Sequence, residues 1–199
     1  MTSYKLLLRV LCIWGLTTAY SASAVEFEIQ PFIGQMYSPD LQGSTSQTDL
    51  SVDNAMNYGI ALSWQDSPNG LGQVMLNAVN HEFTSELDNK EYSLDILYAH
   101  FNGVALFRQQ NYTTTVSLGL GGAYFDSDMS QELYPSATIA IGTRYEFSNN
   151  LALVTELRGY ASIIDNDDNM FCQGETCHAT FDDSLWSETN ISIGFAYKF

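Results

Sequence analysis

Basic residues are scarce in this chain of 199 residues, in which seven Lys and Arg stand against 23 Asp and Glu. All of the acids follow position 24, whereas two of the bases precede it, so the formal net charge from position 25 onward is −18. Such a surface cannot offset nucleic-acid phosphates, which excludes a nucleic-acid partner. The sequence after position 24 also lacks an apolar run of about 20 residues, which excludes a membrane-spanning helix there.

The first residues have the features of a secretory signal peptide. Lys5 and Arg9 form a basic start, an apolar stretch follows over residues 10–20, and Ala22 and Ala24 form an A-x-A cleavage site. We therefore expect residues 1–24 to be removed, and residues 25–199 to form one exported domain.

Cysteine is also rare, with three residues in the chain. Cys172 and Cys177 lie after the signal peptide, and an even number in an exported protein favours a disulfide between them. The alternatives are a free thiol pair or a metal site, for which His178 alone would be a poor further ligand. No cofactor is indicated.

The apolar segments after the signal peptide alternate with period two, and none keeps the spacing of an amphipathic helix. This pattern predicts an all-β protein with eight strands, over residues 25–37, 56–64, 72–83, 92–108, 112–125, 137–147, 151–163 and 185–199. In the third strand, Val74 and Leu76 share one face, but Met75 and Val79 place apolar side chains on the other face as well. In the fourth, we place Leu94, Ile96 and Tyr98 on the apolar face, with a bulge near His100 and Asn102.

The predicted connections alternate in length. Short turns cover residues 65–71, 109–111 and 148–150, and long polar loops cover 38–55, 84–91, 126–135 and 164–184. Eight strands with short turns on one side, long loops on the other and both termini at the short turns are typical of an antiparallel up-and-down transmembrane β-barrel.

A soluble eight-stranded barrel would also alternate, but it would place the apolar face inside. Here the other face is rich in Gly, Ala, Ser and Thr and carries charges of both signs, which suits a crowded lumen. We predict a lumen charge cluster of Asp95, Arg144, Glu146, Glu156, Arg158 and Glu188. Aromatic residues of the apolar face gather near the strand ends, as expected for membrane headgroup regions: Phe27, Trp64, Tyr112, Tyr145, Phe147 and Tyr197 near the short turns, and Tyr37, Tyr58, Tyr92 and Tyr124 near the long loops.

In this pattern the chain resembles the small outer-membrane β-barrels of the OmpA/OmpX type. The sharpest element is the C-terminal row Ile191, Ile193, Phe195, Tyr197 and Phe199, which looks like the signal that the barrel-assembly machinery recognises in that class. The resemblance implies a place in the outer membrane of a Gram-negative cell, contact with its lipid and lipopolysaccharide, both termini in the periplasm, and a role in adhesion or envelope integrity.

The lumen charges allow two interpretations. A three-residue turn at 148–150 would make Arg144 and Glu156 diagonal neighbours, and Arg158 could meet Glu188 on the last strand. Such pairs could gate a narrow solute or ion channel, or they could simply neutralise charges that are costly to bury alone. We favour neutralisation, because eight strands enclose a lumen that side chains fill.

A third hypothesis is an enzyme that modifies lipid A, since barrels of similar size use a Ser-His pair with a carboxylate on the lipid-facing wall. Among His81, His100 and His178, only His100 is expected to face lipid, and it lacks a Ser and a Glu at matching positions. We therefore expect no enzymatic activity.

The long loops hold fifteen acids against the single base Lys90. Residues 165–169 begin like a calcium loop, but Met170 stands where Gly is expected. We favour the alternative, solvated anionic loops that keep the exposed end soluble. The ring closed by Cys172 and Cys177 could present the tip of the last loop to a surface ligand or a phage, but we favour a role in stiffening that loop. The sequence thus predicts a non-enzymatic barrel with a structural or surface-interaction role.

Overall fold

The computed structural model describes residues 26–42, 49–85, 87–164, 170–173, 176–181 and 184–199. The predicted signal peptide, residues 1–24, and the calcium-like stretch 165–169 lie outside these ranges. Among the described residues, no helix is long and apolar enough to cross a membrane.

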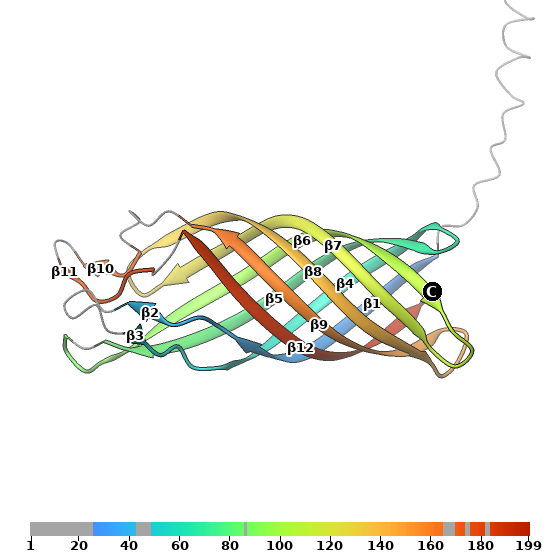
Figure 1. Ribbon diagram of the computed structural model, residues 1–199, viewed down its shortest axis with the longest axis horizontal. Helices are drawn as coiled ribbons and strands as arrows, with labels where there is room; N and C mark the ends of the chain where they lie inside the picture. The colour runs from blue at the N-terminus through green and yellow to red at the C-terminus, as the bar shows by residue number, and fades with distance from the viewer. Residues whose placement is uncertain (1–25, 43–48, 86, 165–169, 174–175, 182–183) are drawn as a thin grey trace, which may run out of the picture.

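Eight long strands close into one antiparallel barrel, which confirms the predicted fold (Figure 1). They are β1 (Phe27–Tyr37), β4 (Ala55–Ser67), β5 (Gly70–Thr84), β6 (Glu91–Arg108), β7 (Thr113–Ser127), β8 (Gln131–Glu146), β9 (Leu151–Ile163) and β12 (Leu185–Lys198). Each pairs with the next in this order, and β12 pairs with β1 to close the barrel. Two short hairpins, β2 (Leu41–Gln42) with β3 (Asp49–Leu50) and β10 (Cys172–Gln173) with β11 (Thr176–Cys177), belong to the connections.

The start of β1 and the end of the chain meet at one end of the barrel. The Phe199 amide donates to the Phe27 carbonyl at 3.0 Å, and the two rings lie 6.4 Å apart. The three short turns lie at the same end, which we call the short-turn end, whereas β2, β3, β10 and β11 lie at the opposite, long-loop end (Figure 1). One predicted loop is much shorter than expected, because β7 continues to Ser127 and β8 begins at Gln131.

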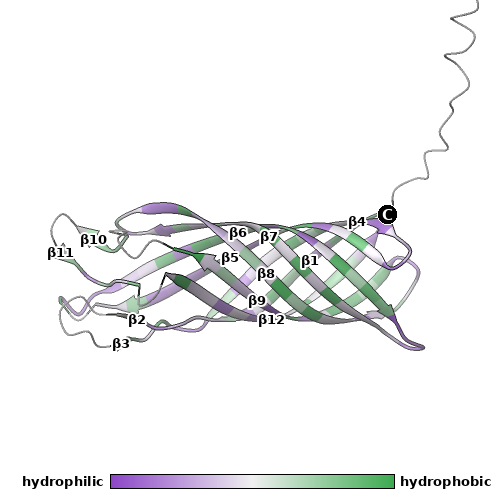
Figure 2. Cartoon of the chain, turned by 45° about the horizontal axis from the view of Figure 1, so that its top comes forward, coloured by the Kyte–Doolittle hydropathy of each residue, from purple (hydrophilic) through white to green (hydrophobic). Residues whose placement is uncertain are grey.

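The apolar side chains of most strands point away from the barrel axis. Leu120 is 73 % exposed and Leu118 is 63 % exposed, whereas Asn57 and Asn77 are fully buried. Hydrophobic and hydrophilic residues succeed each other along the strands of the barrel (Figure 2). In water, a continuous apolar outer band would drive aggregation, whereas lipid tails accommodate it. The predicted sidedness is therefore confirmed for these strands.

The facing of β6 was predicted wrongly. Leu94, Ile96 and Tyr98 are buried inside, whereas Phe101 is exposed outside. The predicted bulge is also wrong, because the pairing with β7 runs without a shift through His100. The one register shift recorded between the described barrel strands lies between Gln65 and Ser67.

The reason for this inversion is an apolar core inside the long-loop half of the barrel, which we call the mouth core. It joins inward side chains of the strands to side chains of the connections, so strands there are apolar on both faces. Its members include Met36, Leu41, Leu50, Val52, Val79, Phe83, Leu94, Ile96, Phe125, Tyr134, Ile164, Met170, Phe171, Phe181 and Trp186. An apolar side chain in such a strand therefore does not reveal which face meets lipid.

Candidate functional site: the filled lumen

Below the mouth core, polar side chains cross the lumen in connected networks. Three of them can be followed along β5, whose inward residues His81, Asn77 and Gln73 each belong to a different one. We describe them from the long-loop end toward the short-turn end, and we add a fourth network that lies beside the short turns.

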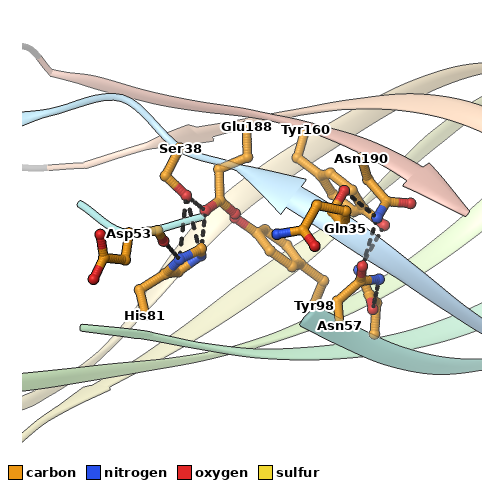
Figure 3. Close-up of polar contacts among 10 residues, drawn as sticks. Gln35, Ser38, Asp53, Asn57, His81, Tyr98, Tyr160, Glu188 and Asn190 are labelled. Atoms are coloured by element: carbon orange, nitrogen blue, oxygen red, sulfur yellow. Dashed lines mark hydrogen bonds and ion pairs between the residues drawn. The ribbon is translucent and has the colours of Figure 1, made fainter. Parts of the chain in front are cut away.

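The first network surrounds the buried carboxylate of Glu188 on β12 (Figure 3). His81 Nε2 lies 2.8 Å from Glu188 Oε1, and the Ser38 hydroxyl donates to the same oxygen at 2.5 Å. The Tyr98 hydroxyl donates to the other oxygen, Oε2. The backbone carbonyl of Asp53 lies 3.1 Å from His81 Nδ1. Glu188 is therefore held by β5, β6 and the connection after β1, and not by Arg158 as predicted.

The second network is a relay of buried amides. Asn190 Nδ2 donates to Asn57 Oδ1 at 2.6 Å, Asn57 Nδ2 donates to Asn77 Oδ1 at 2.7 Å, and Asn77 Nδ2 donates to the Tyr160 hydroxyl at 2.9 Å. The relay joins β12, β4, β5 and β9. Each bond connects one inward side chain to the next, so every side chain of the relay has a hydrogen-bond partner inside the lumen.

The third network is centred on Arg158, which is 2 % exposed. Its Nη2 lies 2.7 Å from Glu156 Oε1, and its Nη1 donates to Thr138 Oγ1 at 3.1 Å and to Asn102 Oδ1 at 3.4 Å. Asn102 then donates to Gln73 at 3.2 Å. Arg158 and Glu156 both belong to the lumen, as predicted, but they pair with each other.

The fourth network lies at the short-turn end. Arg144 donates from Nη1 and Nη2 to the two carboxylate oxygens of Glu28, at 2.6 and 2.5 Å. Its Nε reaches the exposed Glu146 at 3.3 Å. The predicted pair of Arg144 with Glu156 is wrong, although the register does make them diagonal neighbours, since Gly142 faces Glu156 and Arg144 faces Val154.

Two residues of β6, Asp95 of the predicted lumen cluster and His100 of the predicted lipid-facing wall, face the opposite way from the prediction. Asp95 lies on the outer face of β6 and accepts a hydrogen bond from Asn80 at 2.8 Å, so it does not belong to the lumen. His100 points inward and is 2 % exposed, beside the rings of Tyr98 and Tyr160, whose centroids lie 5.9 and 5.8 Å from its own. Both errors follow from the inverted facing of β6. The lipid-facing histidine that a lipid A enzyme would need is therefore not His100.

The networks contain residues that the sequence analysis missed: Glu28, Ser38, Asn57, His81 and Tyr98. Alternation alone marked Glu28 and Asn57 as inward, so their polar character was a usable signal. Their partners lie on strands far away in the sequence, and no local pattern predicts which inward residues meet across a barrel.

A small cavity of about 50 Å³ remains at the short-turn end, beside Glu28 and Arg144. This is room for one or two water molecules. Beyond it, the side chains of the third and second networks lie across the lumen.

The long-loop end carries the predicted disulfide between Cys172 and Cys177. It joins β10 to β11. The residues that flank this hairpin are also hydrogen-bonded, since the His178 amide donates to the Phe171 carbonyl at 2.9 Å. The His178 ring also reaches the connection between β5 and β6, with Nδ1 at 3.0 Å from Ser85 Oγ and 4.0 Å from Asp88 Oδ1.

Asp88 is the centre of a small loop contact. It accepts a hydrogen bond from the Tyr92 hydroxyl at 2.9 Å and another from the Lys90 amide at 3.2 Å. Desolvation alone would raise the pKa of Asp88, but the hydrogen bonds from Tyr92 and Lys90 outweigh it and lower this pKa. In the described part of the chain, no group of three acidic, His or Cys side chains is arranged to hold a metal ion.

The predicted assembly signal forms a row along the outer face of β12. Ile191, Ile193, Phe195, Tyr197 and Phe199 are all exposed to the surroundings of the barrel. Their recognition by the assembly machinery stays a prediction.

None of the protein-family models matches this chain, and no curated protein matches its sequence. Solved structures of similar fold do exist. OprG from Pseudomonas aeruginosa is 14% identical with a TM-score of 0.58, over 88% of this chain and 96% of that protein. Neisserial surface protein A is 12% identical with a TM-score of 0.55, over 87% and 97%. The outer membrane protein AlkL, solved in lipid bilayers, is 15% identical with a TM-score of 0.53, over 87% and 90%.

These three proteins are small outer-membrane barrels, so the fold of this chain is the one that its resemblance to the OmpA/OmpX type implied. At such low identity, the likeness concerns the fold and not the activity.

Proposed function

We propose that this chain is a non-enzymatic barrel of the Gram-negative outer membrane, with a closed lumen and with its function in the connections at the long-loop end. In this orientation both termini lie in the periplasm and the long loops lie outside the cell. The outer wall contacts membrane lipid and lipopolysaccharide, and the barrel-assembly machinery inserts the chain through its C-terminal row.

The observation that carries this proposal is the filled lumen. Buried side chains bond across the lumen, as Arg144 of β8 does to Glu28 of β1 and Asn77 of β5 does to Tyr160 of β9. A channel needs a continuous water path, and an enzyme needs a reactive group that its substrate can reach. The interior of this barrel is occupied by its own side chains, and His100 faces inward and not the lipid, so the ends are the surfaces on which we place the function.

The chemistry of the long-loop end supports a role in surface interaction. Its described acids include Asp40, Asp88, Glu91 and Asp128, and Lys90 is the base among them. Such a surface favours partners that present cationic groups, such as a basic surface ligand or a phage protein. Contact with the phosphates of lipopolysaccharide would need divalent cations between the two anionic layers.

The orientation can be tested on intact cells that express the protein. A Glu-specific protease is suitable, because the long connections are acidic and contain Lys90 as their one tryptic site. We expect fragments cut within the loops and a protected short-turn end. Cleavage at Glu146 in intact cells, or protection of all the long loops, would contradict the proposed orientation.

The interaction role needs a second experiment. Asp88→Asn and Asp128→Asn should reduce retention of cells on a cationic polylysine surface, while Glu146→Gln at the opposite end should leave it unchanged. If all three variants behave like the parent protein, the loops are not the interaction surface.

A further inference from the structure

The described part of the connection between β1 and β4 folds over the open end of the barrel. We call this part, residues 38–42 and 49–54, the strap. Leu41, Leu50 and Val52 are at most 6 % exposed, because they pack into the mouth core. The strap also follows the end of β5, since Val52 forms a bridge with Phe83 and the Asp53 amide donates to the Glu82 carbonyl at 3.1 Å.

Both branches of the strap are bound to one buried pair in the lumen (Figure 3). On the outgoing branch, the Ser38 hydroxyl donates to Glu188 Oε1 at 2.5 Å. On the returning branch, the Asp53 carbonyl lies 3.1 Å from His81 Nδ1. His81 and Glu188 are themselves joined by the 2.8 Å contact between Nε2 and Oε1, and their side chains are fully buried. The strap is therefore attached at both ends to the same carboxylate and imidazole.

The geometry of the imidazole requires a proton on each side. Nδ1 faces a carbonyl oxygen, which can only accept, so it must carry a hydrogen. Nε2 faces a carboxylate oxygen that already accepts from Ser38, so a proton must lie between these two atoms as well. The Ser38 hydroxyl also lies 3.1 Å from Nε2, so a neutral imidazole could still accept a hydrogen bond from Ser38. Its Nε2 lone pair would then point at the Glu188 carboxylate at 2.8 Å, and the one Ser38 hydrogen could serve only one of the two acceptors. The protonated pair therefore holds the two branches of the strap more strongly than the deprotonated pair.

The surroundings offer few other groups that titrate near neutral pH. From β6, Tyr98 donates to Glu188 and His100 stacks behind Tyr98 at 5.9 Å. From β9, the Tyr160 ring lies 4.4 Å from Tyr98, and Arg158 lies beyond it in its own ion pair with Glu156. The buried Asn57 of β4 is uncharged and bonds to Asn77 and Asn190, and the Asp53 carboxylate itself is exposed. Tyrosine and arginine keep their protons near neutral pH, so the groups named above that can change their charge there are the imidazoles and the carboxylates.

We propose that the His81–Glu188 pair is a proton-dependent latch that holds the strap closed over the barrel mouth and releases it when the pair loses its shared proton at alkaline pH. Below the titration of the pair the latch contributes fully to closure, and its contribution is lost as the pH rises through that titration. The device goes beyond the proposed surface role, because it gives the long-loop end two states.

The test is hydrogen–deuterium exchange of the full mature protein, refolded in detergent micelles and followed by mass spectrometry. Protection of peptides that contain Leu41 and Val52 is corrected for the intrinsic pH dependence of exchange. Between about pH 6 and about pH 9, a range that includes the ordinary titration of histidine, we expect this protection to fall by on the order of tenfold. Unchanged protection of the strap in the parent protein overturns the proposal.

Variants identify the group responsible. In His81→Asn the strap should exchange fast already at about pH 6, with no further response to pH, and Glu188→Gln should also lose the response. His178→Asn is the matched control, because this second buried histidine of the long-loop end contacts Ser85 and not the strap. Persistence of the pH response in His81→Asn, or its loss in His178→Asn, contradicts the latch. A heat-modifiability gel first confirms that each variant is a folded barrel.

Discussion

Arg144 and Glu28 form a two-bonded ion pair across the lumen, with N···O distances of 2.6 and 2.5 Å. Arg144 lies on β8 and Glu28 on β1, and the strands β12 and β9 separate them in the sheet. Their side chains are 11 and 8 % exposed. The pair therefore crosses the lumen beside the short turns, next to the small cavity and largely shielded from bulk water.

Removing one partner of this pair should destabilise the barrel, because the other charge stays buried without compensation. We expect Glu28→Gln to lower the free energy of unfolding by about 3 kcal/mol, measured by urea titration in micelles. Glu146→Gln is the control, since its exposed carboxylate touches the same guanidinium, and it should cost less than about 1 kcal/mol. Equal losses in the two variants would show that burial does not govern this ion pair.

Replacing the central residue of the amide relay should also destabilise the barrel. Asn57 accepts from Asn190 and donates to Asn77, so Asn57→Ala removes two buried hydrogen bonds and leaves Asn77 Oδ1 without its donor, whereas Asn190 keeps its bond to the Gln35 carbonyl. A loss of about 2 to 3 kcal/mol in the same urea titration is expected. Asn80→Ala, which breaks a bond to Asp95 on the exposed outer face, should have an effect below about 1 kcal/mol.

The filled lumen predicts the absence of conductance. In planar bilayers the parent protein should show no stable channel, and Arg144→Ala should also remain closed, because the networks around Arg158 and Asn57 still cross the lumen. The channel hypothesis predicts the reverse, namely steps in the parent protein that vanish in Arg144→Ala or Glu156→Ala. Observing those steps would refute the closed lumen.

The disulfide should stiffen the last connection. Cys172 and Cys177 close a small ring, which in the chain-entropy description contributes about 2 kcal/mol to the order of this segment. Replacing both by Ser should speed cleavage of the last connection by a Glu-specific protease on intact cells, while cleavage near Asp88 stays constant. Identical cleavage of parent and variant would mean that the packing of Phe171 and Phe181 suffices.

The hydrogen bonds that Asp88 accepts should be detectable in the pKa of its carboxyl group. Because the pKa of Asp88 is lowered, the contact contributes above the ordinary carboxylate pKa and is lost only as the pH falls through the lowered value. Tyr92→Phe should raise this pKa toward the ordinary value, as read from the carboxyl resonance by NMR. Tyr124→Phe, whose hydroxyl instead donates to Gln131, should not change it.

The sequence predicted the lumen only in part, and particular residues show why. Arg158, Glu156 and Arg144 were identified as lumen charges because they stand opposite apolar residues in cleanly alternating strands. Asp95 and His100 were misplaced because β6 is apolar on both faces, which removes the signal on which the assignment depends. Glu188 was placed inside, but its partners on β5 and β6 could not be deduced from its own strand.

Alternation, turn lengths and the count of strands were enough to determine the eight-stranded membrane barrel, because period two and chain connectivity are local properties of the sequence. Only the tertiary structure decided which polar groups meet, that the loops fold inward as a mouth core, and that the lumen is closed. Closing a sheet into a barrel brings together side chains from strands far apart in the sequence, and their pairing depends on the stagger and tilt of all eight strands at once.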